Sequence, residues 1–384
     1  MFLRLLFLSI ASEGLYLLLA ARYQSVGFEE TPVFFAIWAG LFLAYAFAIR
    51  VVQGPQGKSG RPLLLFIFIT SALFRVSLLL EKGGLPTGAP EAFLHAASPI
   101  RAAMGFRPGF EAIGAALFDL GALAMMPVLL RSLSLPAGLA LVYGWNPLLV
   151  KEGAASGRLE TIPLFFLLFA FLLLQKRRPV ASALAYGASL AGPPFFWATL
   201  PLAARALGFR LVLSLLVSGL AWAPLAAKRS FADLMGWPPD TYIGGSLMPA
   251  TAALAKLFVT RDPLAPFLFC AGVFLLLALA RTAKLGPDGA GLPREALVLL
   301  GCFLFLSPQV LPWAFLPIAG LAAFSANPGW IVATATAPLT YLALGEGKWT
   351  FWLAFAQYFP LYASLVFVAL GTRGGRKARP GKAK

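Results

Sequence analysis

Long apolar runs restrict the fold of this 384-residue chain more than any motif does. The longest lie near 2–21, 33–50, 62–80, 112–130 and 350–371, and a helix needs about 20 apolar residues to cross a bilayer. Hydrophobic residues make up 60% of the chain and charged residues only 12%, whereas about a quarter of a soluble domain is charged. The runs are continuous rather than alternating, which favours helices over strands. We therefore predict an all-α, polytopic integral membrane protein.

Several later apolar runs are too short to cross a bilayer alone, and prolines interrupt them. Pro193–Pro194 splits one region, and Ser307–Pro308 together with Pro312 splits another. Such breaks are tolerated in membranes where the freed backbone groups find partners or line a cavity. We count about 12–14 transmembrane helices, including broken or re-entrant pairs, in a single helical domain over residues 1–371.

The basic residues indicate the topology. They gather in one alternating set of connections, which the positive-inside effect assigns to the cytoplasm. Both termini are then cytoplasmic, residues 372–384 form a basic cytoplasmic tail, and the long loops 81–111 and 228–263 lie outside. Topology thus accounts for the net charge of +16, and we expect no nucleic-acid partner. The basic residues of these connections are Arg50, Lys58, Arg61, Arg131, Lys176, Arg177, Arg178, Arg205, Arg210, Arg281, Lys284 and Arg294.

The chain offers few metal ligands. His95 is its only histidine, and Cys270 and Cys302 lie in separate apolar runs without the spacing of a metal site. The sequence does not indicate a disulfide, and we expect no cofactor.

A group of charges follows a Trp-Asn-Pro break. The segment 145–161 reads WNPLLVKEGAASGRLET, after which an apolar run resumes. Charges set between two membrane-embedded segments should lie at a bilayer surface, where they could form a site that faces water and is supplied from lipid. The alternative is an ordinary solvated loop.

This segment resembles the signature of bacterial polyprenyl-phosphate-sugar-dependent glycosyltransferases of the GT-C superfamily, in the mannosyltransferase-like branch. Arg158 stands where the family usually has His, and Glu160 where it usually has Asp. Residues 307–313, SPQVLPW, resemble a later Ser-Pro…Pro-Trp-Tyr segment, with Ala314 in place of the tyrosine. The resemblance spans roughly residues 62–365. The matching residues of the first segment are Trp145, Asn146, Pro147, Leu148, Glu152 and Gly157.

The resemblance implies an inverting hexosyltransferase in a bacterial-type inner membrane. Such an enzyme would move a mannose-like sugar from a polyprenyl phosphate to a glycan, lipid or protein acceptor at the non-cytoplasmic face. In this family a carboxylate of the first outer loop is thought to act as the base. Glu91 is the one acid that this chain keeps at that place, and the rest of the loop motif is replaced.

Site roles follow from the chemistry of the transfer. Glu91 is the predicted catalytic base, and its alternative is an ordinary solvated glutamate. Arg158, Arg101 and Arg107 are the predicted ligands of the donor phosphate, since arginine binds phosphate through two charge-assisted hydrogen bonds. Their alternative is pairing with lipid headgroups or nearby acids. Glu91 and Glu160 could hold a divalent metal, although two carboxylates do not define a metal site. The other expected lining residues are Trp145, Asn146, Glu152, Glu160 and Trp313.

Three charged residues lie inside apolar runs. Glu13, Arg75 and Asp119 should face the interior of the bundle, with Arg75 paired to Asp119, because each charge costs roughly 2.5–3.5 kcal/mol at the centre of a membrane helix.

Two further functions remain open. A catalytically inactive relative, acting as a subunit or lipid-binding scaffold, would explain the altered first loop. A lipid or solute transporter would also use broken helices, but the sequence has no evident repeat and its charges cluster near the outer surface.

Overall fold

Helices account for 87% of the structure, which confirms the predicted all-α class. The computed structural model describes residues 1–22, 31–54, 60–80, 108–226, 245–247, 264–286, 289, 291–307, 309–325, 327–346 and 350–377. Within these ranges, six helical stretches are long and apolar enough to cross a membrane, and shorter apolar helices accompany them. The chain is therefore a polytopic membrane protein. The total of 12–14 crossings stays a prediction, since several crossings would consist of short pieces.

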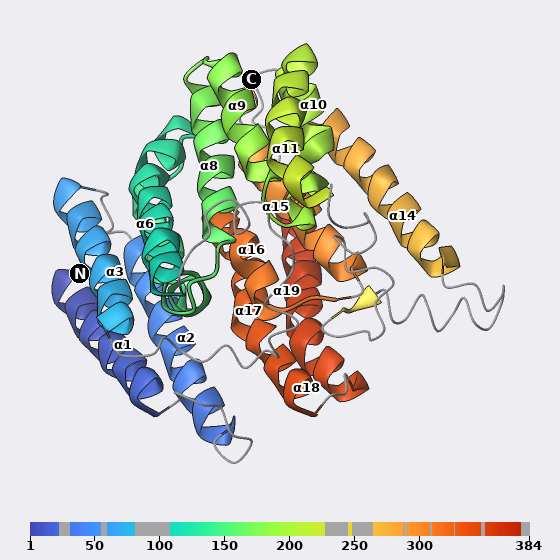
Figure 1. Cartoon of the computed structure of the whole chain (residues 1–384). Coiled ribbons are helices and arrows are strands. Elements are labelled where there is room, and N and C mark those ends of the chain that lie inside the picture. The colour runs from blue at the N-terminus through green and yellow to red at the C-terminus, as the bar shows by residue number, and fades with distance from the viewer. Residues whose placement is uncertain are drawn as a thin grey trace.

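The N-terminal helices form one side of the bundle (Figure 1). Helix α1 packs against α2 and α3, and α3 packs against α6. The first predicted outer loop, 81–111, lies largely outside the described residues, although α6 already begins at Pro108. The helices of this side are α1 (Phe2–Arg22), α2 (Thr31–Gln53), α3 (Arg61–Leu80) and α6 (Pro108–Ser132).

The middle of the chain begins with short pieces and continues with longer helices. Helix α8 packs against α6 and α9, and α9 packs against α11. As predicted, the helix breaks near Pro193–Pro194: α9 ends at Leu190, and the next helical piece, η4, begins at Pro194. The elements are η2 (Ala137–Leu139), α7 (Ala140–Gly144), η3 (Leu149–Ala155), α8 (Thr161–Gln175), α9 (Pro179–Leu190), η4 (Pro194–Thr199), α10 (Leu200–Leu207), η5 (Gly208–Arg210) and α11 (Leu211–Ala226).

The C-terminal third is also broken where the prolines predicted. Helix α15 ends at Leu306, the chain continues extended through Ser307, and a new turn starts at Pro312. Most of the predicted loop 228–263 lies outside the described residues, and α19 extends into the predicted tail as far as Lys377. The elements are α14 (Leu264–Ala283), α15 (Leu292–Leu306), η6 (Pro312–Phe315), α16 (Leu316–Leu321), η7 (Ala322–Phe324), α17 (Gly329–Thr336), η8 (Ala337–Leu339), α18 (Thr340–Glu346) and α19 (Phe351–Lys377).

The outside of the bundle carries large apolar side chains that a soluble protein would bury. Leu3, Phe7, Leu220 and Phe367 are all more than two-thirds exposed. A surface of this kind suits contact with lipid chains.

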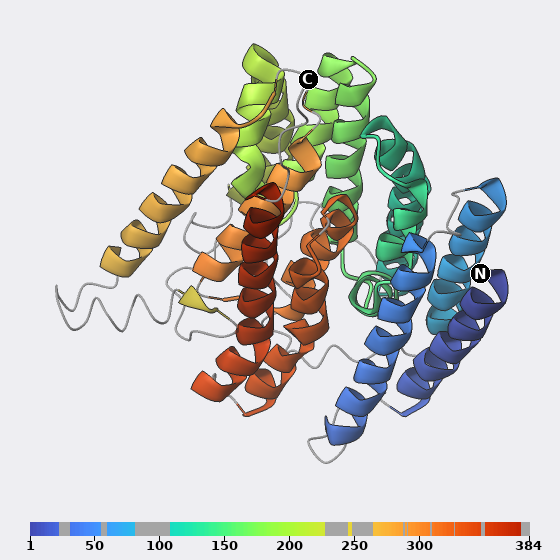
Figure 2. The ribbon, with the colours of Figure 1, turned by 180° about the vertical axis from the view of Figure 1, so that it is seen from behind.

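The ends of several helices point toward one face. Figures 1 and 2 show α8, α14 and α19 running toward the same face, where Lys176, Arg281 and Lys377 lie at or just beyond their last turns. This arrangement agrees with the sidedness predicted from the basic residues. That this face is cytoplasmic stays a prediction.

A buried ion pair joins three helices at the base of the signature segment. Arg75 of α3 pairs through Nε with Asp119 of α6, as predicted, and neither side chain is exposed. The Tyr143 hydroxyl donates to the other Asp119 oxygen at 2.6 Å. Arg75 Nη1 donates to the carbonyl oxygens of Ser71 and Gly144, both at 2.9 Å. Arg75 therefore ties α3 to α6 and to the last residue of α7.

We expect Asp119→Asn to destabilise the protein by about 3–5 kcal/mol, because it leaves a buried guanidinium without its counter-charge. Thermal unfolding in detergent would measure the loss. Glu295→Gln is the matched control, since its partner Arg281 keeps 23% side-chain exposure to solvent and a partly exposed pair contributes about 0–1 kcal/mol. Equal losses in the two variants would contradict the structural role of the Arg75–Asp119 pair.

Candidate functional site

The signature segment folds into a π-helix, η3, between α7 and α8. The backbone N–H of Ser156 donates to the Lys151 carbonyl at 2.8 Å, a bond that spans five residues. Helices α3, α6 and α16 contact η3, and Figure 1 shows this green turn beside the lower end of α6. π-Helical turns are rare and often occur at functional sites, so η3 is the natural place to look for one.

Asn146 holds the start of η3. Its side-chain oxygen accepts from the backbone N–H groups of Leu148 at 3.0 Å and Leu149 at 3.4 Å. Its nitrogen donates to Thr334 Oγ1 at 3.2 Å and lies 3.4 Å from the Tyr45 hydroxyl oxygen. Asn146 thus fixes the turn to α17 and α2 with its own polar atoms.

Trp145 anchors the segment to α3. Its indole N–H donates to Thr70 Oγ1 at 2.9 Å, and its ring packs edge-on against Phe74, with 5.5 Å between ring centroids. It is almost fully buried. These contacts make Trp145 a packing residue of the turn.

Lys151, Glu152 and Arg158 form a buried charged cluster. Their exposed fractions are 3%, 0% and 7%, which rules out the solvated-loop alternative for these residues. Lys151 Nζ and the Tyr341 hydroxyl both donate to Glu152 Oε1, and Lys151 Nζ lies 3.2 Å from the Tyr341 oxygen. Tyr341 belongs to α18, so the cluster joins two distant parts of the chain.

Arg158 lies over the indole ring of Trp313, with 3.6 Å between its guanidinium carbon and the ring centroid. Its Nε is 3.9 Å from Glu152 Oε2, too long for a hydrogen bond. Within the described part of the chain, Arg158 Nε and Nη2 and Glu152 Oε2 have no hydrogen-bond partner. Buried polar groups are usually bonded, and an unbonded one costs about 1–3 kcal/mol or more when charged. The free N–H groups of Arg158 can therefore donate hydrogen bonds to an anion.

The charges of the cluster favour a negative ligand. Two cations and one carboxylate leave a formal excess of one positive charge. Burial alone would raise the pKa of the Glu152 carboxyl, but Lys151 and Arg158 hold that pKa below its ordinary value. Glu152 therefore stays ionised and serves as a counter-ion rather than as a proton acceptor.

Gly157 makes the turn from η3 to Arg158 possible. Its φ is +61°, and a Cβ at this position would come within 3.0 Å of the Ala112 Cα. Both the left-handed backbone and the close approach to α6 require glycine. Backbone geometry thus explains why the signature has a glycine at position 157.

The structure brings together some of the predicted site residues. Glu152, Arg158 and Trp313 meet, although Trp313 comes from η6, late in the chain. Glu160 directly precedes α8 and is partly exposed. The remaining predicted residues, Glu91, Arg101 and Arg107, lie outside the described residues.

Two site residues were missed by sequence reasoning. Lys151 is one of the charges of segment 145–161, and its position next to Glu152 could have indicated an ion pair between the two. Tyr341 carries no such signal, because it lies in an apolar run 189 residues after Glu152. Among the described residues, no three His, Cys, Asp or Glu side chains are grouped as metal ligands.

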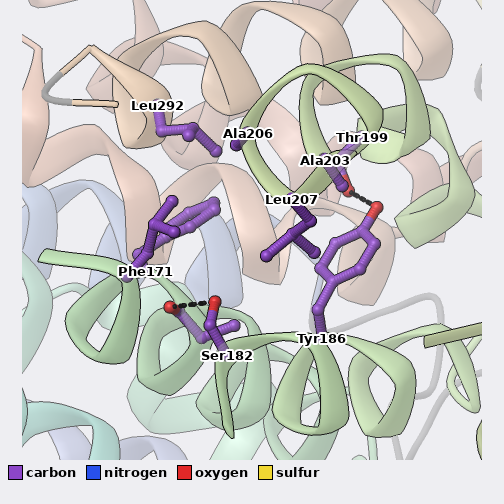
Figure 3. A pocket seen from close by; sticks show the side chains of 10 residues that line it. Phe171, Ser182, Tyr186, Thr199, Ala203, Ala206, Leu207 and Leu292 are labelled. Carbon is purple, nitrogen blue, oxygen red and sulfur yellow. Dashed lines mark hydrogen bonds between the residues drawn. The ribbon is translucent and has the colours of Figure 1, made fainter. Parts of the chain in front are cut away.

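A small apolar cavity lies apart from the charged cluster, between α8, α9, α10 and α15 (Figure 3). Tyr186 and Thr199 bond to each other through their hydroxyls at 2.8 Å, and Ser182 donates to the Ala170 carbonyl at 2.8 Å. Its hydroxyl groups are thus already partnered, and no charged residue lines it. This cavity is therefore not a candidate binding site for the predicted donor phosphate.

The fold and the cluster define the class of the protein: a polytopic helical membrane protein with a buried cluster of charged side chains. No protein-family model, curated protein or solved structure matches the chain.

We expect Gly157→Ala to lower stability by about 2 kcal/mol or more, because left-handed backbone costs a non-glycine residue roughly 1–2 kcal/mol and the new methyl also meets α6. Thermal unfolding in detergent would measure it. Gly289→Ala is the control, since Gly289 has φ +64° and a Cβ there would meet only the side-chain ends of two leucines, at 3.3 and 3.4 Å. A loss at Gly157 no larger than that at Gly289 would contradict the crowding against Ala112.

Proposed function

We propose that this protein is a membrane glycosyltransferase that moves a mannose-like sugar from a polyprenyl phosphate to an acceptor at the non-cytoplasmic face of a bacterial-type inner membrane. The single observation that carries the proposal is Arg158, a buried guanidinium that lies over Trp313 and has N–H groups without a partner. A lipid-linked phosphodiester supplies the anion that such a group lacks. The family resemblance of residues 145–161 supplies the sugar and the reaction.

The path of the chain supports this proposal. The segment that carries Glu91 connects α3 to α6, and both helices contact η3. Glu152 is engaged by Lys151 and Tyr341, so another carboxylate must take the acceptor's proton. Glu91 is the residue that the resemblance places in that role.

The transfer then has a simple division of labour. The acceptor hydroxyl loses its proton to Glu91 as its oxygen attacks the anomeric carbon of the sugar. The bond from that carbon to the phosphate oxygen breaks, and the negative charge that develops on the phosphate is stabilised by Arg158. One attack of this kind inverts the anomeric configuration.

A second candidate is a lipid-phosphate-binding subunit without catalysis. The observation that favours it is the engaged state of Glu152, the one acid of the described cluster. Such a protein would need the same Arg158 site but no base.

We expect Arg158→Gln to weaken binding of a polyprenyl phosphohexose by about tenfold to a hundredfold, because hydrogen bonds to charged groups contribute about 1.5–3 kcal/mol. Displacement of a fluorescent polyprenyl phosphate in detergent would measure it. Arg210→Gln is the matched control, since Arg210 also lies over an aromatic ring, that of Phe209, but outside the cluster. Unchanged binding in Arg158→Gln would contradict the proposed site.

Glu91→Gln tests catalysis separately. We expect it to abolish sugar transfer to below about a hundredth of the wild-type rate, because the base is lost, while binding of the donor persists. Turnover of a labelled polyprenyl phosphohexose in membranes would measure the rate. Full activity in this variant would overturn the role of Glu91, and wild-type binding without any turnover would favour the non-catalytic subunit.

A further inference from the structure

We propose that Glu152 determines the charge selectivity of the Arg158 site: it favours singly charged phosphodiesters and disfavours doubly charged phosphomonoesters. This inference rests on the proposed function and adds a role for one residue of the same site.

The two oxygens of Glu152 have different surroundings. Oε1 accepts hydrogen bonds from Lys151 and Tyr341, which fix the carboxylate in place. Oε2 is buried, has no hydrogen bond, and lies 3.9 Å from Arg158 Nε. The negative charge of Glu152 therefore lies beside Arg158, the cation that binds the ligand, but the two are not joined by a hydrogen bond.

The free edge of Arg158 places a ligand next to that charge. The indole ring of Trp313 covers one face of the guanidinium, so a ligand must bind at the N–H edge, where Nε and Nη2 are free. Nε is the atom that faces Glu152 Oε2. An anion that bonds to this edge comes close to Oε2, and each additional negative charge on it is repelled.

The charge count makes the effect selective. Lys151 and Arg158 supply two positive charges, and Glu152 removes one. A phosphodiester carries one negative charge, whereas a phosphomonoester carries about 1.5 to 2 at pH 7. Like charges placed close together in a water-poor site can change affinity on the order of tenfold or more. Glu152 thus repels the monoester, which corresponds to the polyprenyl phosphate left after transfer. The diester can still bind Arg158.

Two synthetic lipids isolate charge from sugar contacts. The first is a short-chain polyprenyl methyl phosphate, a diester with one charge, and the second is the corresponding polyprenyl monophosphate. Dissociation constants for both would be measured at pH 8, where the monoester is doubly charged, on the detergent-solubilised full chain. The quantity compared is the ratio of the two constants in each variant, so that general losses of affinity cancel.

We expect Glu152→Gln to shift this ratio toward the monoester by about tenfold or more, because it adds one positive charge to the site. The double variant Lys151→Met/Glu152→Gln restores the original excess of charge, and we expect its ratio to stay within about threefold of the wild type. If Glu152→Gln does not fold, Lys151→Met tests the reverse direction, and it must weaken monoester binding more than diester binding.

Two results would overturn the inference while the proposed function stands. One is an unchanged ratio in Glu152→Gln, and the other is an equal shift in the single and double variants, provided that binding still depends on Arg158. Failure of the wild type to bind a polyprenyl phosphohexose would instead overturn the proposed function, and the inference with it.

Discussion

Arg75 and Asp119 form an ion pair without access to solvent, and the path of the chain through the charged cluster depends on it. The pair joins α3 to α6, and a second bond from Arg75 holds the carbonyl of Gly144, where α7 ends. The signature segment starts at the next residue. Removing one partner of a buried pair leaves an uncompensated charge, so both helices are constrained to stay where the pair forms. The π-helix and its charges therefore begin from a fixed point.

Arg75 and Arg158 are both buried arginines, and the contrast between them separates structure from function. Arg75 uses Nε and Nη1 in bonds to a carboxylate and two carbonyls, so most of its cost of burial is offset within the protein, and only its Nη2 has no partner among the described residues. Arg158 has an aromatic ring on one face and a carboxylate beyond hydrogen-bond distance, while its Nε and Nη2 have no partner among the described residues. A buried group left in this way calls for an explanation, and an anionic ligand is the simplest one.

The sequence predicts the parts of this architecture that follow from the cost of placing groups in lipid. The apolar runs require helices, the prolines of 193–194 and 308–312 mark two of the breaks, and Arg75 must pair because a lone charge in a membrane helix is expensive. It does not predict the contact of Tyr341 with Glu152, because no local pattern specifies which distant helix folds back onto the turn. It also does not predict that Lys151 and Glu152 are buried within the protein, since that burial depends on how α3, α6 and α16 surround η3. The family resemblance placed Arg158 and Trp313 in one site, but the sequence did not predict that they touch.

The π-helical form of η3 has a consequence for how this segment tolerates change. A helix bonded across five residues holds more residues in each turn than an α-helix does, and the Ser156–Lys151 bond shows that form here. The number of residues in this turn therefore sets the direction in which each following side chain points, that of Arg158 included. Removing one uncharged residue of this turn, such as Ala154, would keep every charge and every aromatic ring in the chain, yet rotate Arg158 away from Trp313. The geometry of the site therefore depends on the number of residues in η3 as well as on their identity.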